Sequence, residues 1–217
     1  MNLEQARTNM LKQQIRAWGV LDDDILKLVQ TTPREEFVPK AYRKLAFADL
    51  NIPLGQGEVM LTPKEEAYLL QALTITRSDT VLEIGTGSGY LTALLAKLAK
   101  RVYSIEINAD FSQQAKAKLE SLQLQNVELM VGNASQGWEA QQPYDVIVVT
   151  GSLPFLPPSI QKQLKPEGRM FAIVGQAPVM EALLIKRMDE QSFNTTKLFE
   201  TVVPALQQAL QPEAFIF

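Results

Sequence analysis

The sequence predicts an α/β fold with a doubly wound, mostly parallel sheet and an N-terminal helical cap. Short apolar stretches at 80–84, 101–107 and 144–150 have the length of buried strands. Stretches of helical character separate them, and a glycine-rich turn at 85–89 connects the first strand to the next helix. Strands that alternate with helices are typical of a parallel sheet covered by helices on both faces.

Residues 1–75 are expected to form the cap. Apolar residues recur on one face within 3–17 and within 21–30, which predicts two helices. The Thr-Pro-Lys-Glu sequence at 62–65 has the form of a capping box with proline at the first helical position, so a helix is expected over 63–74. No linker rich in Gly, Ser or Pro precedes residues 76–217, so residues 1–217 are expected to be one domain, with the cap packed on an α/β core at 76–217.

The remaining elements follow the same pattern. The predicted helices lie near 90–100, 110–122 and 157–164. The predicted strands lie at 80–84, 101–107, 127–131, 144–150 and 169–175. Two further strands near 182–188 and 194–200 have little between them, which predicts an antiparallel hairpin at one edge of the sheet.

Composition excludes several classes of chemistry. The chain has no cysteine and no histidine, which excludes disulfides, thiolate nucleophiles, imidazole bases and the usual zinc sites. No dense aspartate cluster indicates a metal site. The net charge of −3 argues against a nucleic-acid partner. The first residues contain no apolar signal segment and no window resembles a membrane span, so we expect a cytoplasmic protein without a membrane partner, by default a monomer.

The strongest motif is "VLEIGTGSGY" at 81–90. Gly85, Gly87 and Gly89 follow a predicted strand, where glycine permits a tight turn and close approach of a ligand to the backbone. Glu106 ends the next predicted strand, and a carboxylate there can accept hydrogen bonds from both hydroxyls of a ribose. These residues predict a nucleotide-type ligand at the carboxyl edge of the sheet.

The pattern G-x-G-x-G differs from the dinucleotide pattern G-x-G-x-x-G, and the acidic Glu83 beside the turn disfavours a pyrophosphate. A carboxylate suits a ligand with a cationic centre, an amino group and a ribose. The expected cofactor is therefore S-adenosyl-L-methionine, with S-adenosyl-L-homocysteine as product. A nicotinamide-dependent dehydrogenase is the alternative for such a turn.

The segment "VLEIGTGSGYLTALLAKLAKRVYSIEI" at 81–107 resembles the protein-L-isoaspartate O-methyltransferase family. The stretches "QIRAWGVLDDDILKLVQTTPREEFVP", "AFADLNIPLGQG" and "YDVIVVTGSLPFLPPSIQKQLKPEGRM" agree in order and spacing, and together the resemblance covers about residues 8–175. It implies a Rossmann-like methyltransferase fold and O-methylation of the free carboxylate of L-isoaspartyl residues in damaged proteins. The implied partner is a protein or peptide that carries such a carboxylate.

The resemblance also implies roles for individual residues. Contacts with the methionine end of the cofactor fall on Glu83, Gly85, Thr86, Gly87, Ser88 and Gly89, contacts with the ribose on Glu106 and Ile107, and contacts with the adenine on Asn133 and Ala134. The family usually has an acidic residue where this chain has Asn133. An amide oxygen can still accept a hydrogen bond from the adenine amino group.

The loop before the capping box departs from the family. There the usual pattern is Gly-Gln-Thr-Ile-Ser, one residue, then Pro, and its serine lies near the reacting carboxylate. Aligned at Gly57, this pattern places Glu58, Val59 and Leu61 at the Gln, Thr and Ser positions. Glu58 would repel a carboxylate, and Leu61 cannot donate a hydrogen bond. Thr62 offers a hydroxyl one position along, although a helix N-cap is the simpler role.

The other substrate-side candidates are Val59, Met60, Thr150 and Ser152. Trp18 is interpreted as core packing or a substrate platform, Trp138 as packing near the adenine or core filling, and Asp145 as a cofactor-site residue or a structural cap. Two further functions stay open: a methyltransferase with a changed acceptor, and a non-catalytic module that binds S-adenosylmethionine.

Overall fold

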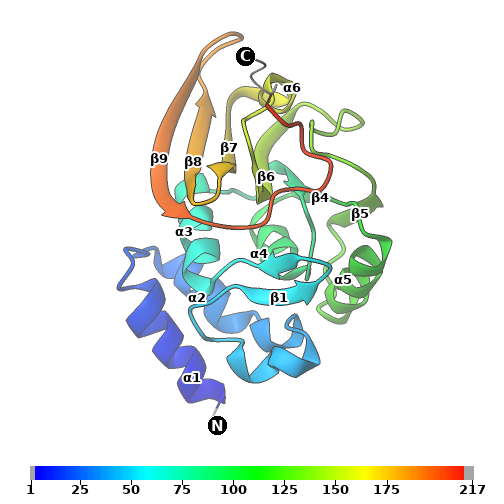
Figure 1. Ribbon diagram of the computed structural model, residues 1–217. Helices are drawn as coiled ribbons and strands as arrows, with labels where there is room; N and C mark the ends of the chain where they lie inside the picture. The colour runs from blue at the N-terminus through cyan, green and yellow to red at the C-terminus, as the bar shows by residue number, and fades with distance from the viewer. Residues whose placement is uncertain (1–2, 213–217) are drawn as a thin grey trace.

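The computed structural model describes residues 3–212. A seven-stranded sheet with the order β5-β4-β3-β6-β7-β8-β9 forms its centre (Figure 1). Its strands are β3 (Thr80–Ile84), β4 (Arg101–Glu106), β5 (Val127–Val131), β6 (Tyr144–Leu153), β7 (Leu164–Gln176), β8 (Val179–Arg187) and β9 (Phe193–Thr201). The first five run parallel, and β8 and β9 add an antiparallel hairpin at one edge. The predicted doubly wound sheet and its edge hairpin are confirmed.

The helices of the sheet region follow the expected positions: α4 (Tyr90–Leu98), α5 (Ala109–Ser121) and the short α6 (Pro158–Lys162). Helix α3 (Pro63–Leu73) begins with the predicted capping box. The Thr62 side chain accepts a hydrogen bond from the Glu65 backbone, and the Glu65 side chain accepts one from the Thr62 backbone. This reciprocal pairing is why the helix begins at Pro63.

The N-terminal region contains α1 (Leu3–Asn9), α2 (Asp23–Thr31) and two short 3-10 segments, η2 (Arg34–Glu36) and η3 (Lys40–Leu45). The single helix expected over 3–17 differs in detail, because its second half is the π-helical segment η1 (Met10–Ile15). Met10 and Ile15 are both buried in the core. Asp22 caps α2 by accepting hydrogen bonds from two backbone amides.

The cap also contains a small antiparallel hairpin, β1 (Ile52–Gly55) and β2 (Glu58–Met60). The sequence analysis treated this segment as a loop. Gly55, Gln56 and Gly57 all have positive φ angles, +100°, +53° and +83°. Positive φ at both central residues, here Gln56 and Gly57, is the requirement of a type I′ hairpin turn, which explains Gly57, while Gly55 lies at a register irregularity at the end of β1.

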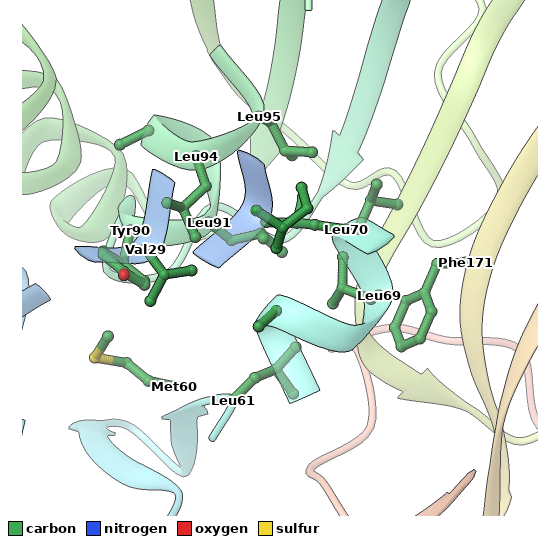
Figure 2. Close-up of a cluster of buried hydrophobic side chains, with 14 of the residues drawn as sticks. Val29, Met60, Leu61, Leu69, Leu70, Tyr90, Leu91, Leu94, Leu95 and Phe171 are labelled. Atoms are coloured by element: carbon green, nitrogen blue, oxygen red, sulfur yellow. The ribbon is translucent and has the colours of Figure 1, made fainter. Parts of the chain in front are cut away.

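The core has two parts, one on each face of the sheet. On one face, valines of β3, β4 and β6 pack against α2, α3 and α4, and the same cluster includes Met10 and Ile15 of the N-terminal region. Figure 2 shows Met60 and Leu61 at the end of the hairpin together with Leu69, Leu91 and Phe171 of this cluster. On the opposite face the cluster contains residues of α6 and of the C-terminal segment. The cap and the sheet therefore share one continuous hydrophobic cluster.

Three residues singled out in the sequence have packing or capping contacts. Trp18 packs against Tyr68 and Phe199, with the Lys64 ammonium over its ring. Trp138 packs with the cluster on the α6 face. Asp145 accepts hydrogen bonds from the Thr80 backbone and from Lys165, and so holds the starts of β3 and β6 together. Asp145 therefore has the structural role.

Candidate active site

A cleft lies at the carboxyl edge of the sheet, where β3, β4, β5 and β6 end. Ligands bind at this edge in open α/β sheets. Of the predicted cofactor residues, the cleft is lined by Gly85, Gly87, Glu106, Ile107, Asn133 and Ala134. Thr86 and Ser88 line a smaller pocket beside it. Glu83 and Gly89 line neither.

The glycine-rich turn fits tightly against β6. A Cβ atom on Gly85 would lie 2.2 Å from the Thr150 hydroxyl oxygen, and the φ angle of Gly85 is +97°. The Thr150 hydroxyl itself is within hydrogen-bond distance of the Ile84 and Gly85 carbonyls. Gly89, with φ +83°, is the N-cap residue of α4, and a Cβ there would lie 2.8 Å from the Cβ of Ala115. Both positions require glycine for space and for backbone conformation.

Glu106 places its carboxylate in the cleft. One oxygen accepts a hydrogen bond of 2.8 Å from the Gly87 backbone, and the other accepts one of 2.9 Å from the Asn108 backbone. These two bonds fix the orientation of the carboxylate. Each oxygen keeps a second lone pair, so the group can still accept from two hydroxyls of a ligand.

Glu83 lies beneath the turn instead of in the cleft. Its side chain is fully buried, and one oxygen accepts hydrogen bonds of 2.6 Å from the hydroxyls of Thr92 and Ser104. Thr86 joins the same network through Ser104. Among residues 3–212 the other oxygen has no hydrogen-bond partner. The structure therefore gives Glu83 a supporting role under the turn, which differs from the direct cofactor contact expected from the sequence, whereas Thr86 joins this network and also lines the smaller pocket.

Burial raises the pKa of Glu83 to about 8, against the lowering effect of the Ser104 and Thr92 hydroxyls. The folded protein therefore favours the protonated carboxyl group. The protein is most stabilised below the unfolded pKa of about 4.5, and this stabilisation is lost as the pH rises toward 8.

For Glu83→Gln we expect the unfolding free energy to decline less steeply than in the wild type between pH 5 and 8. The difference in slope should be about 1 kcal/mol per pH unit. Urea unfolding of both proteins across this range measures it, and parallel curves would contradict the assignment.

A segment at residues 203–208 covers the cleft, and sequence reasoning missed it. Figure 1 shows the chain running from β9 back across the sheet. Val203, Pro204, Leu206 and Gln207 line the cleft. The segment is paired with β6 through Ser152, whose backbone bonds to Pro204 and Leu206.

The same pairing decides the role of Ser152. Its side chain is fully buried, and its hydroxyl donates to the Val203 carbonyl. The expectation of a substrate-side hydroxyl at Ser152 does not agree with this burial. Thr150 does line the cleft, but its hydroxyl proton is directed to the backbone of the glycine-rich turn. Neither hydroxyl is free to donate to a substrate.

At the adenine end predicted by the sequence, Asn133 is held from two sides. Its side-chain oxygen accepts from the Ser135 backbone, and its side-chain nitrogen donates to Gln208 at 2.9 Å. The Ser135 hydroxyl donates to the Gln208 carbonyl. The oxygen of Asn133 keeps a lone pair for an amino group. Gln208 thus positions Asn133, and no pattern in the sequence signalled it.

A smaller pocket lies between the β1–β2 hairpin and the glycine-rich turn. Its apolar walls are Leu54, Val59, Met60, Leu61 and Leu91, and Glu66 and Thr150 also line it. We refer to it as the acceptor pocket, because the family resemblance places the acceptor carboxylate near the residue at position 61. Leu61, at the family serine position, is buried in the core cluster. Thr62 is the helix N-cap, as the simpler interpretation predicts. Glu58 lines the main cleft and accepts a hydrogen bond from Gln207.

Arg34 anchors the wall of the acceptor pocket, and sequence reasoning missed it as well. Its guanidinium is buried, forms an ion pair with Glu66 and lies over the Tyr90 ring. It also donates to the backbone carbonyls of Ala46 and Leu61, at 2.9 and 2.7 Å. The position of Leu61 therefore depends on a side chain far away in the sequence.

Comparison with known proteins decides the family. The family model described as protein-L-isoaspartate(D-aspartate) O-methyltransferase matches residues 5–209. The chain belongs to this family. A protein-L-isoaspartate O-methyltransferase 2 of Pelobacter propionicus is 36% identical over 198 residues, which are 91% of this chain and 88% of the relative. A protein-L-isoaspartate O-methyltransferase 1 of Anaeromyxobacter is 41% identical over 174 residues, 80% of this chain and 82% of the relative.

Two solved structures share the fold of this chain. A protein-L-isoaspartate O-methyltransferase with 27% sequence identity superposes with a TM-score of 0.79, over 92% of this chain and 65% of the other. A putative member from Plasmodium falciparum, solved in complex with S-adenosyl-L-homocysteine, shares the fold with a TM-score of 0.78 at 16% identity. The family model matches the chain as far as residue 209, so the segment at 203–208 belongs to the part that this isoaspartate methyltransferase shares with its family.

Within residues 3–212, no cluster of three acidic side chains suited to a metal ion is present. None of the helices in this range is long and apolar enough to cross a membrane.

Proposed function

We propose that this protein is an S-adenosylmethionine-dependent carboxyl methyltransferase that acts on L-isoaspartyl residues of damaged proteins. The observation that carries the proposal is the glycine-rich turn with Glu106 at the carboxyl edge of β4, in a chain matched by the family over residues 5–209. The family relatives carry the name of this activity.

The residues of the cleft fit the cofactor. A Cβ at Gly85 would collide with Thr150, so the turn leaves backbone open to the cleft only because glycine is present. Glu106 would hold the ribose hydroxyls, and Asn133 with Ala134 would hold the adenine. When bound, S-adenosylmethionine supplies an electrophilic methyl group and leaves as S-adenosylhomocysteine.

The chain needs no general base for this reaction. A carboxyl group with a pKa near 4 is already ionised at neutral pH, so its oxygen can attack the methyl carbon directly. With S-adenosylmethionine bound, the new carbon–oxygen bond would form as the carbon–sulfur bond breaks, and the products would be a methyl ester and a neutral thioether. The work of the protein is to hold the two reactants in line and to exclude water. The apolar walls Val59, Met60 and Leu61 suit that task.

The proposed partner is a protein or peptide with an isoaspartyl carboxylate. A net charge of −3 gives the protein no general attraction for nucleic acid.

The test is transfer of labelled methyl groups to an isoaspartyl peptide and to its normal aspartyl twin. We expect base-labile label on the isoaspartyl peptide alone. If neither peptide is labelled while S-adenosylhomocysteine still binds, the acceptor differs from the proposed one. Binding of NAD in place of S-adenosylhomocysteine would favour the dehydrogenase alternative.

The acidic Glu58, at a position that is usually glutamine in the family, leads to a prediction about the KM for the acceptor. Glu58→Gln removes a negative charge from the cleft rim, so we expect the KM for the isoaspartyl peptide to fall by about two- to fivefold. The family serine is not restored at position 61 in the same variant. Leu61 is buried in the core, and Leu61→Ser would cost about 2–4 kcal/mol of stability. Steady-state kinetics of Glu58→Gln measures the effect, and an unchanged or higher KM would contradict it.

A further inference from the structure

Glu66 lines the acceptor pocket but is paired with Arg34, so Glu58 beside the pocket is the acidic residue that bears on an anionic acceptor. It begins β2, directly before the residues that form the acceptor pocket, and its side chain is half-buried. It lines the main cleft but not the acceptor pocket, whereas Val59 lines both. No salt bridge among residues 3–212 includes Glu58, so its charge is not neutralised by a cation. Where its carboxylate points therefore matters for an anionic substrate.

Gln207 determines that direction. Its side-chain nitrogen donates a hydrogen bond of 3.0 Å to a carboxylate oxygen of Glu58, across 149 positions of sequence. The bond ties the carboxylate to the C-terminal segment, and both of these residues line the main cleft while neither lines the acceptor pocket.

Gln207 is itself held in place on both sides. The preceding residue, Leu206, donates its backbone N–H to the Ser152 carbonyl. The following residue, Gln208, is bound by Asn133 and Ser135. Gln208 also has a φ angle of +59°, a conformation that few side chains other than Asn and Asp adopt without cost. These contacts offset that cost and fix the direction in which Gln207 projects.

We propose that Gln207 is a specificity-determining positioning residue, which holds the Glu58 carboxylate away from the acceptor pocket so that an isoaspartyl carboxylate can enter. The inference rests on the proposed function, since only an anionic acceptor is repelled by Glu58. This role of Gln207 explains how the protein can accept a carboxylate as substrate although Glu58 replaces the usual glutamine of the family. Gln207 acts through Glu58 and touches neither reactant in this role.

The experiment is a double-mutant cycle on the full chain with an isoaspartyl peptide. Wild type, Gln207→Ala, Glu58→Gln and the double variant are compared by KM and kcat at low and high ionic strength. Gln207→Ala frees the Glu58 carboxylate, so KM should rise about three- to tenfold at low salt and less at high salt, with kcat nearly unchanged. In the Glu58→Gln background the same change should leave KM within about twofold. Gln125→Ala, an exposed glutamine before β5, is the control and should match wild type.

A structural role for Gln207 gives a different result. If Gln207 only keeps the C-terminal segment closed, KM rises equally in both backgrounds and does not respond to salt, which overturns the inference. An unchanged KM for Gln207→Ala overturns it too. A wild-type protein that forms no methyl ester on the isoaspartyl peptide overturns the proposed function and the inference together. If the wild type is active but the effects of Gln207→Ala and Glu58→Gln on KM are additive, the inference alone is overturned.

Discussion

Replacement of Gly85 by alanine is expected to weaken the binding of S-adenosylhomocysteine by about 100-fold or more. The added Cβ would lie 2.2 Å from the Thr150 hydroxyl oxygen. Thr150 cannot turn away freely, because its hydroxyl is bonded to the backbone at Ile84 and Gly85. The turn must therefore open, and it carries with it the Gly87 amide that orients Glu106. Backbone strain of about 1–2 kcal/mol adds to the collision, and about 3 kcal/mol in total corresponds to roughly 100-fold.

Gly55→Ala is the matched control for this variant. Gly55 has nearly the same φ angle, +100°, but a Cβ there would meet no atom within 4 Å. It shares the backbone strain without the collision, so its effect on binding should be below about tenfold. Isothermal titration calorimetry with S-adenosylhomocysteine compares the two variants, and circular dichroism checks that both are folded. Equal losses in both variants would show that the contact with Thr150 is not decisive.

Arg34→Met should destabilise the protein by about 3–5 kcal/mol, because it leaves the Glu66 carboxylate buried without its partner. It also removes the donors to the Ala46 and Leu61 carbonyls. Arg34→Met combined with Glu66→Leu removes both charges and should recover a large part of the loss. Urea unfolding gives the unfolding free energy of each variant.

Arg16→Met is the control for the loss of an ion pair. The Arg16–Asp23 pair is exposed, with 53% and 86% of the side-chain surfaces accessible, so its loss should cost less than about 1 kcal/mol. If Arg34→Met costs no more than Arg16→Met, the buried pair does not anchor the acceptor pocket. A double variant that is as unstable as Arg34→Met would point to the two carbonyl bonds instead of the unpaired charge.

The fold was predictable because its signals are local. The alternation of apolar strands with helices, the capping box at Thr62 and the paired strands past residue 180 each lie within a few neighbouring residues. The β1–β2 hairpin was missed because its strands, Ile52–Gly55 and Glu58–Met60, are too short for a periodic pattern. Its turn nevertheless carries a readable signal, the two glycines around Gln56.

The site was predictable only where one motif supplies it. Gly85, Gly87 and Glu106 come from a single strand–turn–helix–strand unit, and the structure places all three in one cleft. The contacts of Arg34 with Leu61 and of Gln207 with Glu58 join distant segments. Side chains of ordinary type at ordinary positions give no sequence pattern for such contacts. Glu83 and Ser152 are the opposite case. A carboxylate and a hydroxyl beside the predicted site suggested contact with a ligand, but both side chains are buried by the packing around them.

The most direct test of the central claim is a competition in one mixture. An isoaspartyl peptide and its aspartyl twin are incubated with S-adenosylmethionine and the wild-type protein, and mass spectrometry follows the methyl ester on each. Glu106→Ala, which lacks the carboxylate expected to bind the ribose, serves as the matched variant. We predict ester on the isoaspartyl peptide alone, formed by the wild type and strongly reduced in the variant at low cofactor concentration. Ester on both peptides, or an equal yield with Glu106→Ala, would contradict the assignment of this cleft and this acceptor.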